Sequence, residues 1–192
     1  MPWSLRAIGP DSLARYASVP STVEVNSILV TEPLAGGLGG IRLVEQPVAV
    51  PYVKDYDAHE APGTWHRTFD LARGWLVLAE ADDTAGSVLG AAATYLESAE
   101  VATLWDIRVR PGEQRAGIGR RLLEDAAVWA REAGARWLHA ETQNVNMPAC
   151  RFYAGLGATL GAVDRFQYVG QPDVAHEVAL HWYLDLATPP PP

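Results

Sequence analysis

The sequence predicts an α+β fold, with a mostly antiparallel central sheet of about six or seven strands, one parallel pair within it, and flanking helices. Three observations support this prediction. Strand-like segments at residues 75–80, 87–95 and 104–109 follow one another through short turns, which is typical of an antiparallel meander. An amphipathic segment with apolar side chains at helical spacing begins near Gly117. Another strand-like segment, residues 136–142, follows this helix, so it is expected to lie parallel to the strand before the helix.

The part of the chain before the meander gives weaker signals. The first 26 or so residues are ambiguous, although residues 11–16 could form a short helix capped by Asp11. Residues 27–31 and 41–45 read as strands joined by a glycine-rich turn at residues 36–40. No helix start follows that turn, so it is interpreted as a hairpin connection and not as a phosphate-binding loop.

After the meander, the central helix is expected to end at Gly134. A second short helix, residues 148–154, begins with a proline just inside it, as helices prefer. Residues 158–163 and 178–184 are expected to complete the sheet as a final strand pair. The chain is therefore expected to form a single domain over residues 1–187. The proline-rich tail, residues 188–192, has nothing to bury and is expected to be disordered.

Composition narrows the function classes. No apolar run approaches the ~18–20 residues of a spanning helix, and the N-terminus lacks the layout of a secretory signal. The only cysteine, Cys150, excludes an internal disulfide framework and fits a reducing compartment. Together these features lead us to expect a cytoplasmic protein without a membrane partner. The net charge of −8 argues against nucleic acid and favours a cationic small molecule, although acidity serving solubility alone is an equally good reading. The five histidines show no metal-ligand spacing, so no metal is expected.

An anion site is predicted where the strand ending at Val109 leads into the central helix. The first-turn N–H groups of a helix have no partner within it, and the helix dipole adds a partial positive charge there. Gly117 and Gly119 let a phosphate approach the backbone without meeting a Cβ atom. Three arginines add positive charge: Arg115, Arg120 and Arg121. On spacing alone, the glycine pair also suits a simple tight turn.

The run Gln114-Arg115-Ala116-Gly117-Ile118-Gly119 resembles the Gln/Arg-x-x-Gly-x-Gly/Ala signature of the GNAT N-acetyltransferase superfamily. The resemblance implies a GNAT-type acyl-CoA N-acyltransferase fold in which this loop holds the pyrophosphate of acetyl-CoA. Asn146, Ala149, Phe152 and Tyr153 match the pattern by which that family binds the arm of the coenzyme. Many relatives carry Arg-Gly where this chain has Gln114-Arg115, which could weaken coenzyme binding. The resemblance implies coenzyme contacts by Ile107, Val109, Gln114, Arg115, Ala116, Gly117, Ile118, Gly119, Arg120, Asn146, Ala149, Phe152 and Tyr153.

A narrower resemblance is to the streptothricin acetyltransferases. It is carried by Asp106-Ile107-x-Val109, by Glu141 to Asn146, by Tyr168-x-Gly170, by Val178 to Leu184 and by Lys54-Asp55-Tyr56. It implies acetyl transfer to an amino group of a small cationic acceptor, with streptothricin as the named candidate. Three alternatives stay open: a different small amine, a peptide or protein amine, and a non-catalytic acetyl-CoA-binding module. Many relatives form dimers, so a homodimer also stays open.

In the reaction that the resemblance implies, an amine attacks the acetyl thioester directly. The carbonyl is expected to face a backbone N–H near Val109, and Tyr153 is expected to protonate the leaving thiolate, since a phenol with an ordinary pKa of about 10 is protonated at neutral pH. Asp106 is the first choice for a base acting through water and Glu141 the second. A structural ion pair, or no base at all, is also compatible with these residues. Segments 52–68 and 164–177 are expected to line the acceptor pocket, with four possible cation clamps: Asp55, Asp57, Asp164 and Glu177.

Overall fold

The computed structural model describes the chain from Pro2 to Ala187; Met1 and residues 188–192, the expected tail, are outside the described part. The described chain divides into two compact units. Within the described residues, unit 1 contains residues 2–22, Asp55–His139 and residues 185–187. Unit 2 contains Val23–Lys54 and Ala140–Leu184. The expected single domain over residues 1–187 stays a prediction.

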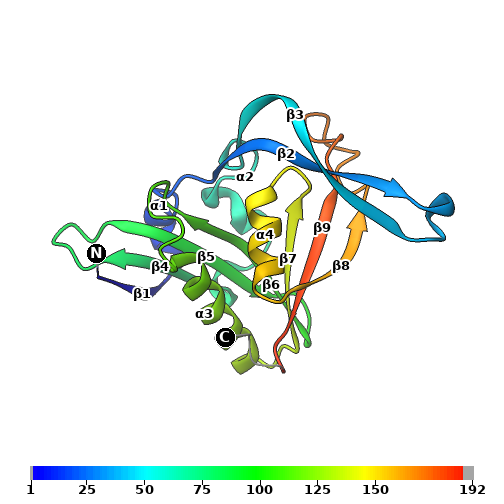
Figure 1. Ribbon diagram of the computed structural model, residues 1–192. Coiled ribbons are helices and arrows are strands. Elements are labelled where there is room, and N and C mark those ends of the chain that lie inside the picture. The colour runs from blue at the N-terminus through cyan, green and yellow to red at the C-terminus, as the bar shows by residue number, and fades with distance from the viewer. Residues whose placement is uncertain (1, 188–192) are drawn as a thin grey trace. The chain divides into compact units, whose positions relative to one another are not determined.

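A seven-stranded sheet in the order β1-β4-β5-β6-β7-β9-β8 is the framework of the fold (Figure 1). It is mostly antiparallel with one parallel pair, and helix α3 connects β6 to β7, so the predicted α+β class is confirmed. Strands β2 and β3 form a separate two-stranded sheet. The strands are β1 (Trp3–Ile8), β2 (Thr22–Pro33), β3 (Ile41–Asp55), β4 (Trp75–Ala81), β5 (Val88–Leu96), β6 (Val101–Val109), β7 (Trp137–Gln143), β8 (Thr159–Asp164) and β9 (Ala179–Asp185). The helices are α1 (Leu13–Tyr16), α2 (Asp57–Glu60), α3 (Ile118–Glu132) and α4 (Met147–Gly155).

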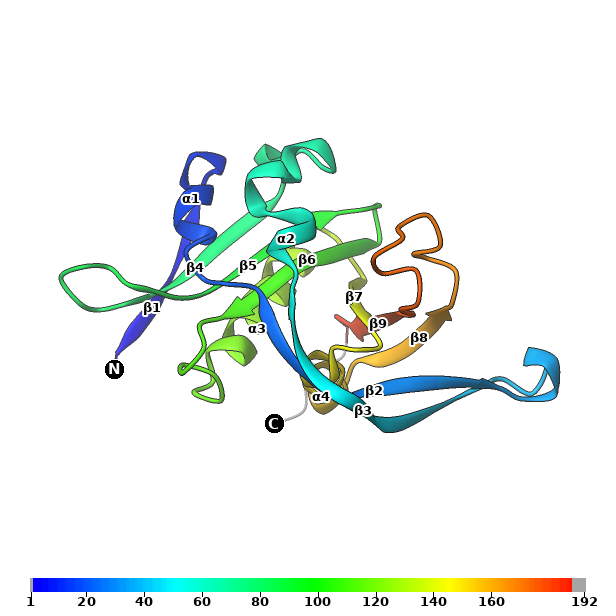
Figure 2. The same cartoon turned by 90° about the horizontal axis from the view of Figure 1, so that it is seen from above.

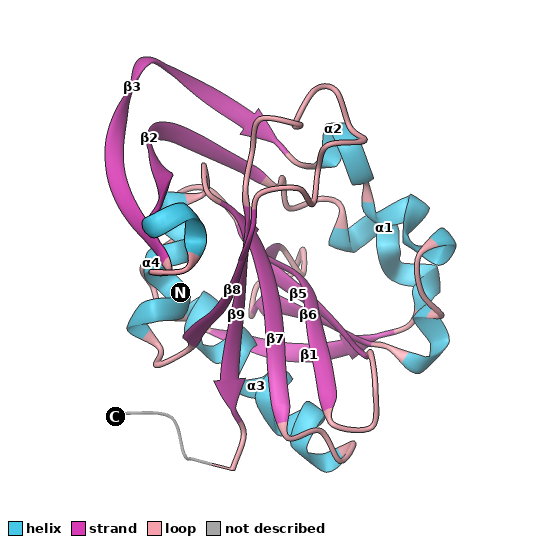
Figure 3. Ribbon diagram, turned by 90° about the vertical axis from the view of Figure 1, so that its right-hand side faces the viewer, coloured by secondary structure: helices cyan, strands magenta, loops and turns pink. Residues whose placement is uncertain are grey.

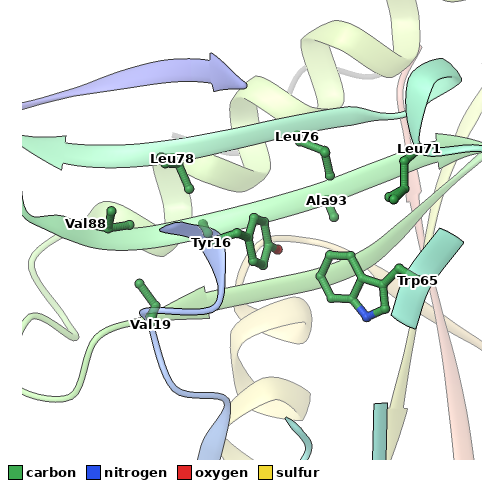
Figure 4. Packing of buried hydrophobic residues seen from close by; sticks show 9 residues of the cluster. Tyr16, Val19, Trp65, Leu71, Leu76, Leu78, Val88 and Ala93 are labelled. Atoms are coloured by element: carbon green, nitrogen blue, oxygen red, sulfur yellow. The ribbon is translucent and has the colours of Figure 1, made fainter. Parts of the chain in front are cut away.

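Unit 1 is built on the predicted meander, in which β4, β5 and β6 pair antiparallel. Helix α3 lies on one face of these strands, and α1 lies on the other together with the 3-10 turns η3 (Pro62–Arg67) and η4 (Leu71–Arg73) (Figure 2). On this second face Tyr16 and Trp65 are fully buried against Leu78 and its neighbours (Figure 4). Burying such large side chains is the main source of stability in this half of the unit.

The start of α3 is fixed on the sheet by a close approach at Gly90. A Cβ atom at that position would lie 2.9 Å from Ile118 Cγ2 and 3.0 Å from the Arg108 carbonyl oxygen, closer than real side chains allow. Ile118, the first residue of α3, is 1% exposed and anchors the helix start in the core. The N-terminus of α3 therefore has a defined position beside β5 and β6.

A β-bulge interrupts β6 at Trp105. Ala93 pairs with Asp106, whereas the next β5 residue, Thr94, pairs with Leu104, so Trp105 has no opposite residue on β5. A bulge of this kind breaks the strict alternation of side chains along a strand. As a result Trp105 and Asp106 both face the side of the sheet on which α1 and η3 pack: Trp105 contacts the Tyr95 ring, and Asp106 contacts Tyr16.

Unit 2 contains the long β2–β3 hairpin (Figure 3), the antiparallel β8–β9 pair and helix α4. Asn144, which is buried, ties three of its segments together. Its side chain donates to the Leu29 carbonyl at 2.8 Å and accepts from the Val178 N–H at 2.9 Å. The predicted hairpin and final strand pair are therefore confirmed, although the hairpin strands are longer than expected.

Two local expectations at the N-terminus differ from the structure. The chain forms an unpredicted strand, β1, which pairs with β4; half of its residues are exposed and none is buried, so its apolar pattern is weak. The short helix exists at Leu13–Tyr16, but Asp11 lies within a preceding 3-10 turn and does not cap it.

Candidate active site

The loop that joins β6 to α3 has the geometry of an anion site. Gly117 is the N-cap of α3, has φ of +84°, and no side chain caps the helix start. The run Gln114–Gly117 is exposed, and a Cβ atom at Gly117 would meet nothing within 4 Å. The unpaired first-turn N–H groups therefore lie at an open surface, where a phosphate could accept hydrogen bonds from them.

Arg115 gives this loop an unusual backbone conformation. Its φ of +64° lies in the left-handed region, which costs a non-glycine residue roughly 1–2 kcal/mol. Its side chain is exposed, and so are the side chains of Arg120 and Arg121, although Arg120 also pairs with Glu124 at 3.8 Å. The loop thus concentrates positive charge in a protein whose net charge is −8.

Asp106, the first candidate for the base, lies in a buried ion network of unit 1. Arg108, which is 5% exposed, donates to both oxygens of Asp106, from Nε at 2.8 Å and from Nη2 at 2.9 Å. The Tyr16 hydroxyl donates to Asp106 Oδ2 at 2.6 Å. Arg108 also donates from Nη1 to the Val19 carbonyl and to Asp57 Oδ2, each at 3.0 Å. This arrangement favours the structural ion pair that the sequence left open.

The electrostatics of this network match its geometry. Burial by itself would lower the pKa of Arg108, but the negative charge of Asp106 raises it above its ordinary value, so the guanidinium stays charged. Burial and the charge of Asp106 also raise the pKa of Tyr16 well above that of a free phenol. Tyr16 therefore remains a donor to Asp106 at every physiological pH.

Glu141, the second candidate for the base, lies in a polar cluster of unit 2. The Tyr168 hydroxyl donates to Glu141 Oε1 in a short hydrogen bond, and the Gln143 amide donates to the same oxygen at 3.2 Å. Burial raises the pKa of Glu141, the hydrogen bond from Tyr168 and the charge of Lys54 lower it, and the charge of Glu177 raises it. A carboxylate whose pKa is raised toward neutrality is suited to general-base work.

Lys54 and Glu177 form a buried ion pair in the same cluster. The Lys54 ammonium contacts both oxygens of Glu177, and the two side chains are 8% and 3% exposed. Breaking such a pair is costly, because it leaves one charge buried without compensation. The charge of Glu177 is thus paired with that of Lys54, and its expected role as a cation clamp stays a prediction.

The other three expected clamps take part in local structure. Asp55 Oδ1 accepts from the Asp57 N–H at 3.0 Å, and Asp164 Oδ1 accepts from the Phe166 N–H at 2.7 Å. Asp57 belongs to the Arg108 network described above. These bonds occupy one oxygen of each carboxylate, so a role in acceptor binding stays a prediction.

Helix α4 carries the second motif. Asn146 caps it by accepting from the Ala149 N–H at 3.1 Å. Cys150 is buried beside Thr142, and burial raises the pKa of its thiol, as expected for a structural cysteine. Tyr153 is 5% exposed; its ring stacks on Trp182 with centroids 6.4 Å apart and meets Phe152 edge-on at 5.3 Å. Its orientation is thus set by packing.

Several residues that shape these clusters were not singled out from the sequence. Tyr16, Arg108, Gln143, Lys54 and Tyr168 hold the candidate carboxylates, and Trp105 shares a face with Asp106 only because of the bulge. Lys54, Gln143 and Tyr168 lie within runs that carried the narrower resemblance, which was the available signal.

Between Pro2 and Ala187, no group of three or more His, Cys, Asp or Glu side chains is arranged to hold a metal ion. Over the same residues, no helix has the length and apolar content that crossing a membrane requires.

Comparisons with known proteins agree with this geometry. The family description "Acetyltransferase (GNAT) family" matches residues 43–158. A streptothricin acetyltransferase of Streptomyces lavendulae is 36% identical over 141 residues, which cover 68% of this chain and 69% of that protein. One from Escherichia coli is 37% identical over 84 residues, or 44% of this chain, and the chain spans about half the length of that relative (48%).

Two solved structures extend the similarity to nearly the whole chain. A nourseothricin acetyltransferase superposes with a TM-score of 0.79 at 25% identity, covering 97% of this chain and 99% of that one. A structure from Bacillus anthracis str. Ames, solved in complex with acetyl coenzyme A, superposes with a TM-score of 0.77 at 24% identity, covering 96% and 98%. At 24% identity, the similarity to the second structure supports the fold alone.

Proposed function

The chain belongs to the GNAT acetyltransferase family, and from this premise we propose that it transfers the acetyl group of acetyl-CoA directly to an amino group of a small cationic acceptor. The observation that carries the proposal is the exposed loop at residues 114–117 together with the first turn of α3 that follows it. Its helix N-terminus, its open approach at Gly117 and its arginines are suited to a diphosphate. Acetyl-CoA is the proposed cosubstrate.

We propose streptothricin as the acceptor. The curated relatives that align with this chain are streptothricin acetyltransferases, and one of them shares 36% identity over 68% of the chain. The net charge of −8 favours a cationic acceptor over nucleic acid. A peptide amine is the main competitor, and an acceptor screen separates the two.

The proposed chemistry moves two protons, and exchange with water then returns a proton from the carboxylate to the Tyr153 phenolate, which restores the starting state. The neutral amine attacks the thioester carbonyl, whose oxygen is expected to be stabilised by a backbone N–H near Val109. The C–S bond breaks, and the thiolate takes a proton from Tyr153. The new ammonium loses its proton through water to a carboxylate. Glu141 is the better candidate for that carboxylate, because its pKa is raised by burial, whereas both oxygens of Asp106 are held by Arg108.

An acceptor screen that reads CoA thiol release tests this proposal. We expect thiol release only when acetyl-CoA and a cationic amine are both present, with streptothricin among the best acceptors. Tyr153→Phe should lower kcat about 10- to 1000-fold while acetyl-CoA binding persists, because the phenol acts on the leaving group. Tyr183→Phe is the matched control and should leave kcat unchanged. Tight acetyl-CoA binding without turnover of any amine would contradict the enzyme assignment.

A homodimer is a further proposal. Exposed apolar side chains gather on the β2–β3 hairpin, among them Leu38 (98% exposed), Val50 (75%) and Val53 (64%). Light scattering that gives the mass of one chain across micromolar concentrations would contradict it.

A further inference from the structure

Three half-buried aromatic side chains of unit 1, Phe69, Tyr95 and Trp105, form a cluster that we call the aromatic platform. Phe69 stacks on Tyr95 with centroids 4.7 Å apart and an interplanar angle of 16°. Trp105 meets Phe69 edge-on at 5.5 Å and lies 6.1 Å from Tyr95. These rings pack at the edge of the buried core but keep part of their surface in solvent. Aromatic rings that pack on one another and still keep part of their surface in solvent can contact a ligand without unfolding the core.

The platform lies beside the strand that carries the candidate site. Because the bulge turns Trp105 to the same face as Asp106, the platform continues directly along β6 from the Arg108 network. Phe69 joins the platform to Trp65 at 6.4 Å. At this inner end a cation already lies against aromatic rings, since the Arg108 guanidinium is 5.2 Å from the Tyr16 ring centroid and 5.9 Å from that of Trp65.

A carboxylate stands at the outer end of the platform. Glu97 is two residues beyond Tyr95 and is 54% exposed. Thr103, the β6 partner of Tyr95, donates to Glu97 Oε2 at 2.6 Å, and His139 Nδ1 lies 3.8 Å from the same oxygen. These contacts hold the carboxylate near the rings; its charge contributes to raising the pKa of Tyr95, after burial.

This combination selects for positive charge. An ammonium group is attracted to the faces of aromatic rings, and a nearby carboxylate adds Coulomb attraction. A neutral apolar ligand would remove water from Glu97 without compensating its charge, which costs free energy.

We propose that the aromatic platform and Glu97 bind a second cationic group of the acceptor, distal to the amine that receives the acetyl group. The inference rests on the proposed function and deepens it: the preferred acceptors carry at least two ammonium groups on one chain. Binding of the distal ammonium selects the acceptor and takes no part in the chemical step.

The first test measures binding without turnover. A pentyltrimethylammonium ion cannot be acetylated, and its neutral analogue replaces the trimethylammonium group by tert-butyl. We expect the charged probe, and not the neutral one, to shift the indole N–H resonance of Trp105, identified with Trp105→Phe. Tyr95→Leu and Glu97→Gln should each weaken binding of the probe about 3- to 30-fold, whereas Glu132→Gln, on α3 at the other face of the sheet, should not. Equal binding of both probes would overturn the inference.

The second test measures selection during turnover. A diamine acceptor is compared with an analogue whose distal ammonium is a hydroxyl. Tyr95→Leu should raise KM for the diamine about 3- to 30-fold with kcat unchanged, Tyr95→Phe should keep the wild-type KM because the ring remains, and neither should affect the hydroxyl analogue. Equal effects on both acceptors would overturn the inference. Wild-type protein that binds the charged probe but acetylates no amine would refute the proposed function and leave the cation site standing.

Discussion

Replacing Tyr168 by Phe tests which carboxylate is the base. The change removes one hydrogen bond to Glu141 and keeps the ring that packs around it. A hydrogen bond to a charged group contributes about 1.5–3 kcal/mol, so kcat/KM below the pKa of the base should fall roughly 10- to 100-fold. Burial already raises the pKa of Glu141, and the hydrogen bond from Tyr168 opposes this rise. Without the phenol the pKa of Glu141 rises further. As the pH is lowered, the variant therefore loses the active ionised form of Glu141 at a higher pH than the wild type does.

The chain offers a matched control, because a second tyrosine donates to the other candidate. Tyr16→Phe removes the hydrogen bond to Asp106 and leaves Arg108 bound to both of its oxygens. Rates of thiol release are measured from about pH 5 to about pH 9 at saturating acetyl-CoA. We expect only Tyr168→Phe to move the acid limb of the pH–rate profile to higher pH. At pH values above this limb its rates should be close to those of the wild type. A Tyr168→Phe profile that superimposes on wild type, or a Tyr16→Phe profile that moves, would refute the assignment of Glu141.

Three further predictions follow from other contacts. Arg115→Gly relieves the left-handed strain that Arg115→Ala retains, so the glycine variant should be more stable by about 1 kcal/mol in thermal unfolding, and equal stabilities would contradict the strained backbone. Arg108→Met removes a buried cation and leaves the partly buried carboxylates of Asp106 and Asp57 without it, which should cost up to about 3–5 kcal/mol in urea unfolding. Part of this loss should return when Asp106→Asn is added, and a loss below about 1 kcal/mol would argue against the network. Glu177→Gln removes a charge that raises the pKa of Glu141, so the acid limb of the pH–rate profile should move to lower pH. This direction is opposite to that expected for Tyr168→Phe, and a shift to higher pH would exclude the coupling between Glu177 and Glu141.

The central strand, loop and helix could be predicted because their signals are local. The meander, the helix start at Gly117 and the Asn146 cap each depend on residues within a few positions of one another. The strand β1 gave a weak signal because much of its surface is exposed, and its partner β4 begins far along the chain.

The ion networks could not be predicted, because they join residues distant in sequence. Tyr16 and Asp106 are 90 positions apart, and Lys54 and Glu177 are 123 apart. The sequence does not show that Arg108 binds both oxygens of Asp106, so a base and a structural ion pair both stayed open for this carboxylate. The bulge at Trp105 could not be predicted either, because it is defined only by the pairing of β6 with β5.

The proposed activity requires residues 115–119 to hold the diphosphate of the coenzyme. The direct measurement is a titration of the ¹⁵N-labelled protein with acetyl-CoA, followed through backbone amide resonances. The largest shifts are expected at residues 115–120, where first-turn N–H groups would bond to phosphate oxygens. No binding, or shifts centred on the other glycine-rich turn at residues 36–40, would contradict the assignment of the coenzyme site to this loop.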